Sequence, residues 1–147
     1  MTDHTIGIDI SKDHLDAHRL IDGKSRRFAN DRSGHKALIA WIGCDVVRIV
    51  YEPTGPYHRK LEQALAAADL PLVKVNPRQA RRFFEGAGQL AKTDRLDAAM
   101  LATMGSLLAI APRLARSPLL HELKDLHMIV SRILPITEDL LKQVSSK

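Results

Sequence analysis

The stretch Ile6-Gly7-Ile8-Asp9-Ile10 decides how this chain folds, because it is a short apolar run that carries a carboxylate near its end. A second run of the same kind, Arg48-Ile49-Val50-Tyr51-Glu52, also ends on an acidic residue, and Pro53-Thr54-Gly55 follows it. Short apolar runs rich in β-branched residues and bounded by turn residues are typical of buried strands. We therefore predict two core strands with Asp9 and Glu52 near their ends.

The rest of the chain to Pro112 alternates between strand and helix patterns. An Asp-Gly turn signal in Ile21-Asp22-Gly23-Lys24 predicts a hairpin. Three antiparallel strands, followed by single strands alternating with helices, are the element order of the ribonuclease H-like α/β fold, in which the first and fourth strands would be neighbours. In open sheets of this kind, function gathers at the carboxyl ends of the strands. The predicted strands are Thr5–Ile10, Leu15–Leu20, Ser25–Ala29, Val46–Tyr51 and Leu72–Val75; the predicted helices are Ser33–Ile42, Tyr57–Ala68, one beginning at Asn76-Pro77, and Asp97–Ile110.

Two further carboxylates lie in Lys92-Thr93-Asp94-Arg95-Leu96-Asp97-Ala98, spaced i, i+3 at the start of a predicted helix. Carboxylates repel one another, and a divalent cation such as Mg²⁺, which prefers oxygen ligands, removes that cost. We predict that Asp9, Glu52, Asp94 and Asp97 converge on a metal site. Each has a simpler explanation by itself: a turn residue for the first two, and a favourable helix-dipole interaction of roughly 0.3–1 kcal/mol for the last two.

The chain has 22 Lys and Arg residues against 17 Asp and Glu, which gives a net charge of +5 and suits a polyanionic partner. Its single cysteine, Cys44, excludes an internal disulfide framework and fits a reducing compartment. No stretch has the apolar length of a membrane span, and the first residues have no signal-peptide pattern. We expect a cytoplasmic protein that does not bind membranes.

Basic residues concentrate next to the acidic motif. Arg78, Arg81 and Arg82 would share one face of a helix, where they could follow a phosphate backbone. A solvated charged surface is the alternative. The seven histidines are scattered and no cysteine accompanies them, so we do not expect zinc. The predicted nucleic-acid-binding residues are Lys12, Lys74, Arg78, Arg81, Arg82, Lys92 and Arg95.

The tail has apolar residues in the 4-3 spacing of a coiled-coil seam. We expect a homo-oligomer that forms through residues 119–144, with an amphipathic helix folded back on the preceding domain as the alternative. Pro135 predicts a kink, or a helix end near Leu134 with a new short helix capped by Thr137-Glu138-Asp139. The seam residues are Leu119, Leu123, Leu126, Val130, Ile133, Thr137, Leu140 and Val144.

Residues 5 to about 108 resemble the N-terminal catalytic domain of the DEDD insertion-sequence transposases and Piv-type DNA invertases, which is similar to the RuvC Holliday-junction resolvase. The resemblance implies an α/β fold with a ribonuclease H-like (RuvC-like) mixed sheet flanked by helices. It places a RuvC-like catalytic domain in residues 1–112 and a helical extension in residues 113–147. The matching motifs are Ile6-Gly7-Ile8-Asp9-Ile10-Ser11-Lys12, Tyr51-Glu52-Pro53-Thr54-Gly55, Val75-Asn76-Pro77-Arg78-Gln79-Ala80-Arg81-Arg82-Phe83 and Ala91-Lys92-Thr93-Asp94-Arg95-Leu96-Asp97-Ala98.

By this resemblance, Asp9, Glu52, Asp94 and Asp97 correspond to the acidic tetrad that binds Mg²⁺, for which Mn²⁺ can substitute. The family cuts and rejoins DNA at specific sites, and its insertion-sequence members are guided by a structured RNA. Family members continue into a second domain with a serine nucleophile. No serine of this chain lies in a segment that matches that motif, so complete recombination is expected to need the second domain.

Two rival functions remain open at the level of sequence. A nucleic-acid-binding or assembly module without catalysis could keep the same fold. The run Gly7-Ile8-Asp9-Ile10-Ser11 also resembles the first phosphate loop of actin-like sugar kinases and ATPases. Those enzymes need a second Asp-x-Gly loop and a glycine-rich adenosine site, which this chain with eight glycines does not show.

Overall fold

A computed structural model of the chain describes residues 3–89, 96–112 and 118–145. The chain forms two compact units, residues 1–115 and residues 116–147. The first is an α/β unit and the second is a helix, and each is described by itself below.

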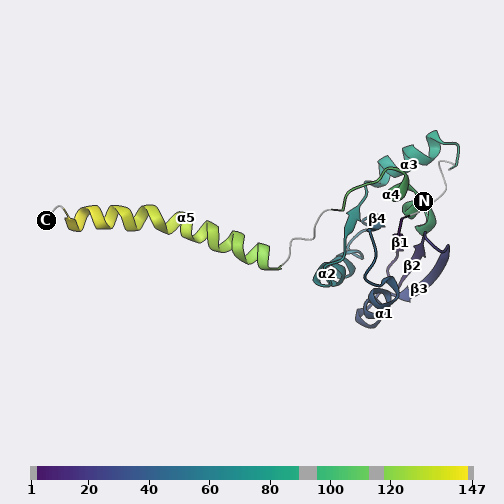
Figure 1. Cartoon of the computed structure of the whole chain (residues 1–147), viewed down its shortest axis with the longest axis horizontal. Coiled ribbons are helices and arrows are strands. Elements are labelled where there is room, and N and C mark those ends of the chain that lie inside the picture. The colour runs from purple at the N-terminus through teal and green to yellow at the C-terminus, as the bar shows by residue number, and fades with distance from the viewer. Residues whose placement is uncertain (1–2, 90–95, 113–117, 146–147) are drawn as a thin grey trace. The chain divides into compact units, whose positions relative to one another are not determined.

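A five-stranded mixed sheet is the centre of the α/β unit (Figure 1). Its order is β3-β2-β1-β4-β5, with β1 antiparallel to β2, β2 antiparallel to β3, and β1, β4 and β5 parallel. This order confirms the predicted ribonuclease H-like sheet and the pairing of the first strand with the fourth. The strands are β1 (Thr5–Ile10), β2 (His14–Arg19), β3 (Lys24–Ala29), β4 (Arg48–Tyr51) and β5 (Leu72–Lys74).

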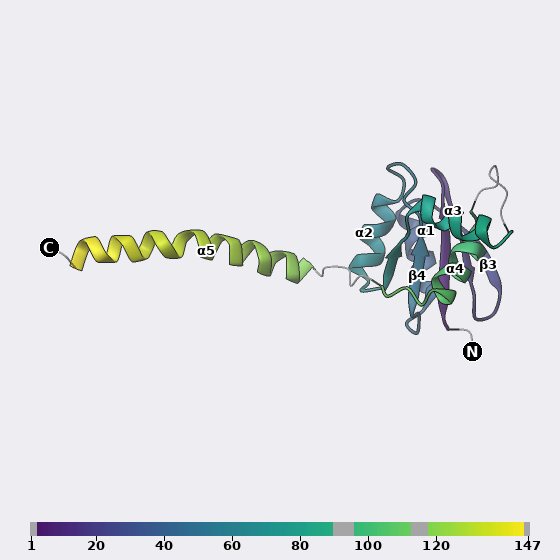
Figure 2. The same cartoon turned by 90° about the horizontal axis from the view of Figure 1, so that it is seen from above.

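Four helices cover the two faces of this sheet, α1 and α2 on one face and α3 and α4 on the other (Figure 1; Figure 2 gives the view from above). Side-chain caps begin three of them: Asp31 accepts from the Gly34 amide, Asn76 from the Arg78 amide, and Asp97 from the Met100 amide. Such caps satisfy amides that have no partner within the helix. The helices are α1 (Arg32–Ile42), α2 (Arg59–Ala67), α3 (Pro77–Gly86) and α4 (Ala98–Leu107).

The observed ends of the elements differ from the predicted ones by up to three residues. Helix α2 begins at Arg59 because Tyr57 closes a turn on the Thr54 carbonyl first. Helix α4 ends at Leu107, before Pro112, because Ala109 adopts a left-handed φ of 44°. The Ile110 amide then donates to the Gly105 carbonyl, which is the pattern of a Schellman cap.

Strand alternation divides the core into two clusters, one on each face of the sheet. Even-numbered residues of β1 point towards α1 and α2, whereas odd-numbered residues point towards α4. The first cluster includes Ile6, Ile8, Ile10, Leu38, Ile42, Leu61 and Leu65; the second includes Val50, Val73, Val75, Ala80, Phe84, Leu101 and Met104.

Gly7 and Gly105 allow α4 to lie directly on the sheet. A Cβ atom on Gly7 would be 1.9 Å from the Ala98 carbonyl oxygen and 2.7 Å from the Ala102 amide nitrogen. A Cβ atom on Gly105 would be 2.4 Å from Cγ2 of Val50 in β4. Both contacts are far below the ordinary separation of carbon from its neighbours, so only glycine permits this helix position.

A buried polar network fixes the far end of α4. Arg48, which is 7% exposed, forms an ion pair with Asp3 and donates to the Ile110 carbonyl at 3.1 Å. Asp3 also accepts from the hydroxyls of Thr5 and Ser106. Burial pushes the pKa of Asp3 upward, but the hydrogen bonds from Thr5, Arg48 and Ser106 outweigh it and leave the pKa below its usual value. The carboxylate therefore stays charged and connects the N-terminal segment, β4 and α4.

The second unit is a single helix, α5 (Pro118–Ser145), which passes through Pro135 without ending. The predicted end near Leu134 and the new helix capped at Thr137 are therefore wrong. Proline removes one backbone hydrogen bond, to the Ser131 carbonyl, but the turns on either side remain intact. The Thr137 hydroxyl acts within the same helix and donates to the Leu134 carbonyl at 2.8 Å. Among the described helices, none is long and apolar enough to span a membrane.

We expect Gly7→Ala to destabilise the α/β unit by about 1–3 kcal/mol or more, because the new methyl group would displace backbone atoms of α4. Urea unfolding followed by the fluorescence of Trp41, the one tryptophan of the chain, measures this unit specifically. Gly86→Ala is the matched control, since a Cβ atom there meets nothing within 4 Å. Equal stabilities of the two variants would contradict the proposed close packing.

Candidate acidic active site

Asp9 and Glu52 come from neighbouring parallel strands. Ile8 of β1 pairs with Tyr51 of β4, so Glu52 follows the end of β4 at the level of Asp9. Both carboxylates belong to residues that alternation directs towards the α4 side of the sheet. Both residues are half-buried. Two predicted site residues are therefore placed side by side by strand pairing.

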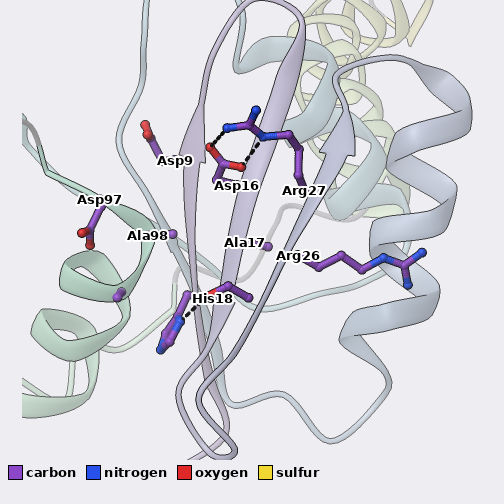
Figure 3. A pocket seen from close by; sticks show the side chains of 10 residues that line it. Asp9, Asp16, Ala17, His18, Arg26, Arg27, Asp97 and Ala98 are labelled. Carbon is purple, nitrogen blue, oxygen red and sulfur yellow. Dashed lines mark hydrogen bonds and ion pairs between the residues drawn. The ribbon is translucent and has the colours of Figure 1, made fainter.

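Asp97 approaches this pair from the start of α4. Its side chain accepts a hydrogen bond from the Met100 amide at 2.8 Å, which makes it the cap of the helix. Because Ala98 contacts Gly7, the start of α4 is held next to β1. Asp9 and Asp97 consequently line one pocket of about 390 Å³ (Figure 3). Glu52 is not among the described residues that line it.

The fourth predicted carboxylate, Asp94, lies outside the described residues, as do Lys92 and Arg95. Within residues 3–89, 96–112 and 118–145, no three His, Cys, Asp or Glu side chains are grouped closely enough to hold a metal ion. The carboxylates that do lie here, Asp9, Glu52 and Asp97, offer the hard oxygen ligands that Mg²⁺ prefers. Convergence of all four carboxylates remains a prediction.

Sequence reasoning missed Asp16, which lines the same pocket as Asp9 and Asp97. It lies opposite Asp9 in the pairing of β1 with β2. Arg27 of β3 lies opposite Asp16 and donates to both of its carboxylate oxygens, from Nε at 2.8 Å and from Nη2 at 3.0 Å. The signal was the hairpin itself, since an Asp-Gly turn of known length determines which residues of two strands are opposite.

A second missed feature connects the loops that follow β1 and β4. Asn30 donates through Nδ2 to the Ser11 carbonyl at 2.9 Å and to the Tyr57 carbonyl at 3.1 Å. Because its amide nitrogen donates to both loops, its amide oxygen is the acceptor for Nε2 of buried His35 at 2.8 Å. Burial lowers the pKa of His35, which favours the neutral ring. These contacts fix the relative position of the two loops beyond Asp9 and Glu52.

The predicted basic residues that the structure describes lie on different elements of the α/β unit. Arg78 and Arg82 are exposed on α3 and Arg81 is half-buried there. Lys74, by contrast, forms an ion pair with Glu62 of α2 at 3.0 Å. Lys12 is exposed and lines a separate pocket with Lys60 and Tyr57.

Glu62 of α2 is the centre of a polar cluster that connects this helix to β4 and β5. It accepts from the Tyr51 hydroxyl at 2.9 Å as well as pairing with Lys74. Burial and this hydrogen bond raise the pKa of Tyr51 far above its usual value. Burial also pushes the pKa of Glu62 upward, but its bonds to Lys74 and Tyr51 outweigh burial and lower it. The cluster thus keeps a neutral phenol and a charged carboxylate, and it holds Lys74 on the α2 side.

Comparison with known proteins gives the family. A family model for DEDD transposases of the IS110 type, described as transposase, matches residues 6–139. The chain belongs to this transposase family. It is also similar to the pilin gene-inverting proteins of Moraxella bovis and Moraxella lacunata, each 30% identical over 108 residues. These matches cover 69% of the chain and 34% of each relative, so the chain spans about a third of the length of these relatives.

The family match confirms the resemblance inferred from the four motifs, together with the ribonuclease H-like fold that it implied. At the level of the family, the role is DNA recombination. Asp9, Glu52 and Asp97 lie within the matched residues, and so does α5 up to residue 139.

Proposed function

We propose that this chain is the N-terminal catalytic domain of a DNA transposase or site-specific recombinase that cleaves and transfers DNA strands with Mg²⁺, or Mn²⁺ in its place. The observation that carries the proposal is the shared pocket of Asp9 and Asp97, with Glu52 at the end of the adjacent strand. Asp9 and Asp97 come from separate parts of the sequence, and a turn role for the first and a helix-cap role for the second give no reason for them to line the same pocket.

In this proposal, Asp9, Glu52, Asp94 and Asp97 hold the metal. When bound, a divalent ion supplies charge neutralisation and polarises a phosphoryl oxygen. The chain's own part is to keep the carboxylates at fixed positions, through strand pairing for Asp9 and Glu52 and through the helix cap for Asp97. The arginines of α3, together with Lys12, Lys92 and Arg95, would contact the phosphate backbone, whereas Lys74 is paired with Glu62 on the α2 side of the sheet.

Complete recombination is proposed to require a second domain with the serine nucleophile of the family. DNA is the proposed partner, and a structured guide RNA is the further partner of insertion-sequence members. Strand exchange by these 147 residues alone would contradict the proposed requirement for a second domain.

The metal site is tested by Mn²⁺ binding, measured by isothermal titration calorimetry on the full chain. We expect Asp9→Asn and Asp97→Asn each to weaken Mn²⁺ binding at least tenfold, because each removes a charged oxygen ligand. Asp45→Asn is the control, since Asp45 is exposed in the connection between α1 and β4. Unchanged affinity in both site variants would contradict the metal assignment and favour a module without catalysis.

The α3 arginines are tested by DNA binding at several salt concentrations. Replacing Arg78, Arg81 and Arg82 together by alanine should weaken binding to all sequences and lower the salt slope by about one for each lost phosphate contact. The same slope in the triple variant and the unaltered chain would mean that these side chains form only a solvated surface.

Self-association through residues 119–144 is tested by sedimentation velocity. Leu126 and Val130 of the seam are 56% and 49% exposed, and an apolar surface of this kind marks an interface. We expect Leu126→Glu with Val130→Glu to give a monomer. Met128→Glu is the matched control, because Met128 is 56% exposed but lies off the seam. A monomeric unaltered chain at high concentration would contradict the oligomer.

A further inference from the structure

Three charged residues form a row across three adjacent strands on the α4 side of the sheet. Asp9 of β1 lies opposite Asp16 of β2, and Asp16 lies opposite Arg27 of β3. Directly opposite residues direct their side chains to the same face. All three line the pocket that also contains Asp97, as Figure 3 shows. The row therefore ends in a cation beside a group of carboxylates.

The Arg27 guanidinium is oriented, although it is solvent-accessible. Its side chain is 64% exposed, yet two hydrogen bonds hold Nε and Nη2 against the two oxygens of Asp16. Its third nitrogen, Nη1, makes no hydrogen bond with any residue that the structure describes. A guanidinium held along one edge in this way can still donate to a phosphate from its free edge.

Neighbouring Arg26 provides an internal comparison. It comes from the same strand and is also among the residues that line the pocket, but alternation directs its side chain to the opposite face, where its guanidinium lies 5.0 Å from the centre of the Phe28 ring and points away from the carboxylates (Figure 3). Edge strands often carry basic residues that prevent association with other strands. That role would apply to Arg26 and Arg27 alike, and it gives no reason for the contact of Arg27 with a pocket carboxylate.

We propose that Arg27 binds a backbone phosphate of the nucleic-acid strand whose reacting phosphate lies at Asp9 and Asp97, and that Asp16 is the positioning residue that fixes the guanidinium. This inference rests on the proposed function. Two strand spacings, about 10 Å, separate Asp9 from Arg27 across the sheet. The contacted phosphate is thus a near neighbour of the reacting one along the strand, on the β3 side of the pocket.

Arg27 also changes the charge balance of the pocket. A phosphate that approaches Asp9, Asp16 and Asp97 meets three carboxylates, and like charges repel at short range. A metal held as proposed would offset part of this repulsion at Asp9 and Asp97, whereas Arg27 offsets the charge of Asp16. Arg27 thus makes the β3 side of the pocket accessible to a polyanion.

The test compares Arg27→Gln with Arg26→Gln in the full chain, by fluorescence anisotropy with a labelled 20-base-pair DNA duplex and an RNA duplex of the same sequence in Mg²⁺. Both variants lose one positive charge. We expect Arg27→Gln to weaken binding about tenfold and to lower the salt slope by about one, whereas Arg26→Gln changes affinity less than about twofold. Trp41 fluorescence checks that both variants fold. Equal effects of the two substitutions would overturn the proposal.

Asp16→Asn tests the positioning role, because a general electrostatic effect and an orienting role predict opposite changes in affinity for the duplex. Removal of a negative charge should tighten binding to a polyanion, as Asp45→Asn measures at an exposed position. If Asp16 orients Arg27, Asp16→Asn weakens binding instead, by about threefold or more. Tighter binding by Asp16→Asn would overturn the positioning role.

Mn²⁺ titration separates this inference from the proposed function. Arg27→Gln should keep the Mn²⁺ affinity of the unaltered chain, since Arg27 is not a ligand. Intact Mn²⁺ binding without binding of either duplex would overturn the role of Arg27 and leave the metal site standing. If Asp9→Asn and Asp97→Asn do not change Mn²⁺ affinity, but Arg27→Gln still weakens duplex binding more than Arg26→Gln does, the proposed function fails. The role of Arg27 then stands as part of a nucleic-acid-binding surface without catalysis. The DNA and RNA duplexes show which backbone is bound.

Discussion

The direct contact between α4 and the backbone of β1 at Gly7 is the constraint on which the rest of the structure depends. Helices ordinarily pack on sheets through side chains, which keep the two backbones well apart. Here the absence of a side chain at Gly7 allows the Ala98 carbonyl to lie against the strand. Since Asp97 immediately precedes Ala98, this contact also determines how near the cap carboxylate comes to Asp9. Stability and the acidic pocket therefore have one common origin.

The other end of α4 shows how the helix is kept in this position. Gly105 removes a second side chain where the helix meets Val50, and Arg48 then connects β4 to the Ile110 carbonyl and to Asp3. A buried arginine is costly unless its donors are satisfied, and here the Ile110 carbonyl, the Asp3 carboxylate and the Thr5 hydroxyl accept three hydrogen bonds from Arg48. The helix is thus held by close backbone packing at its beginning and by a polar network at its end.

Much of the fold could be predicted from sequence, because its determinants are local. Apolar runs marked the strands, and Asn76 with Pro77 marked the start of α3. Asp97 was expected at the start of a helix, and it is the cap of α4. The failure at Pro135 has a physical reason: proline removes one hydrogen bond, and a helix of 28 residues retains enough others to continue.

The residues that sequence reasoning missed depend on contacts between distant segments. Nothing near Gly7 in the sequence indicates that a helix some ninety residues later lies against it. Asp16 and Arg27 become neighbours only when the register of the hairpin is known. Asn30 is a polar residue after a strand, and its role follows from two carbonyls, of Ser11 and Tyr57, that lie in different loops.

The bridge made by Asn30 has a consequence for the energetics of the site. A loop that moves alone must lose its own conformational entropy when it becomes ordered around a ligand, at roughly 1–2 kcal/mol for each residue fixed. Here one amide joins the loops after β1 and β4, and buried His35 fixes the orientation of that amide. Much of this conformational entropy is therefore lost already during folding. A ligand that binds at this edge of the sheet consequently contacts two preorganised loops.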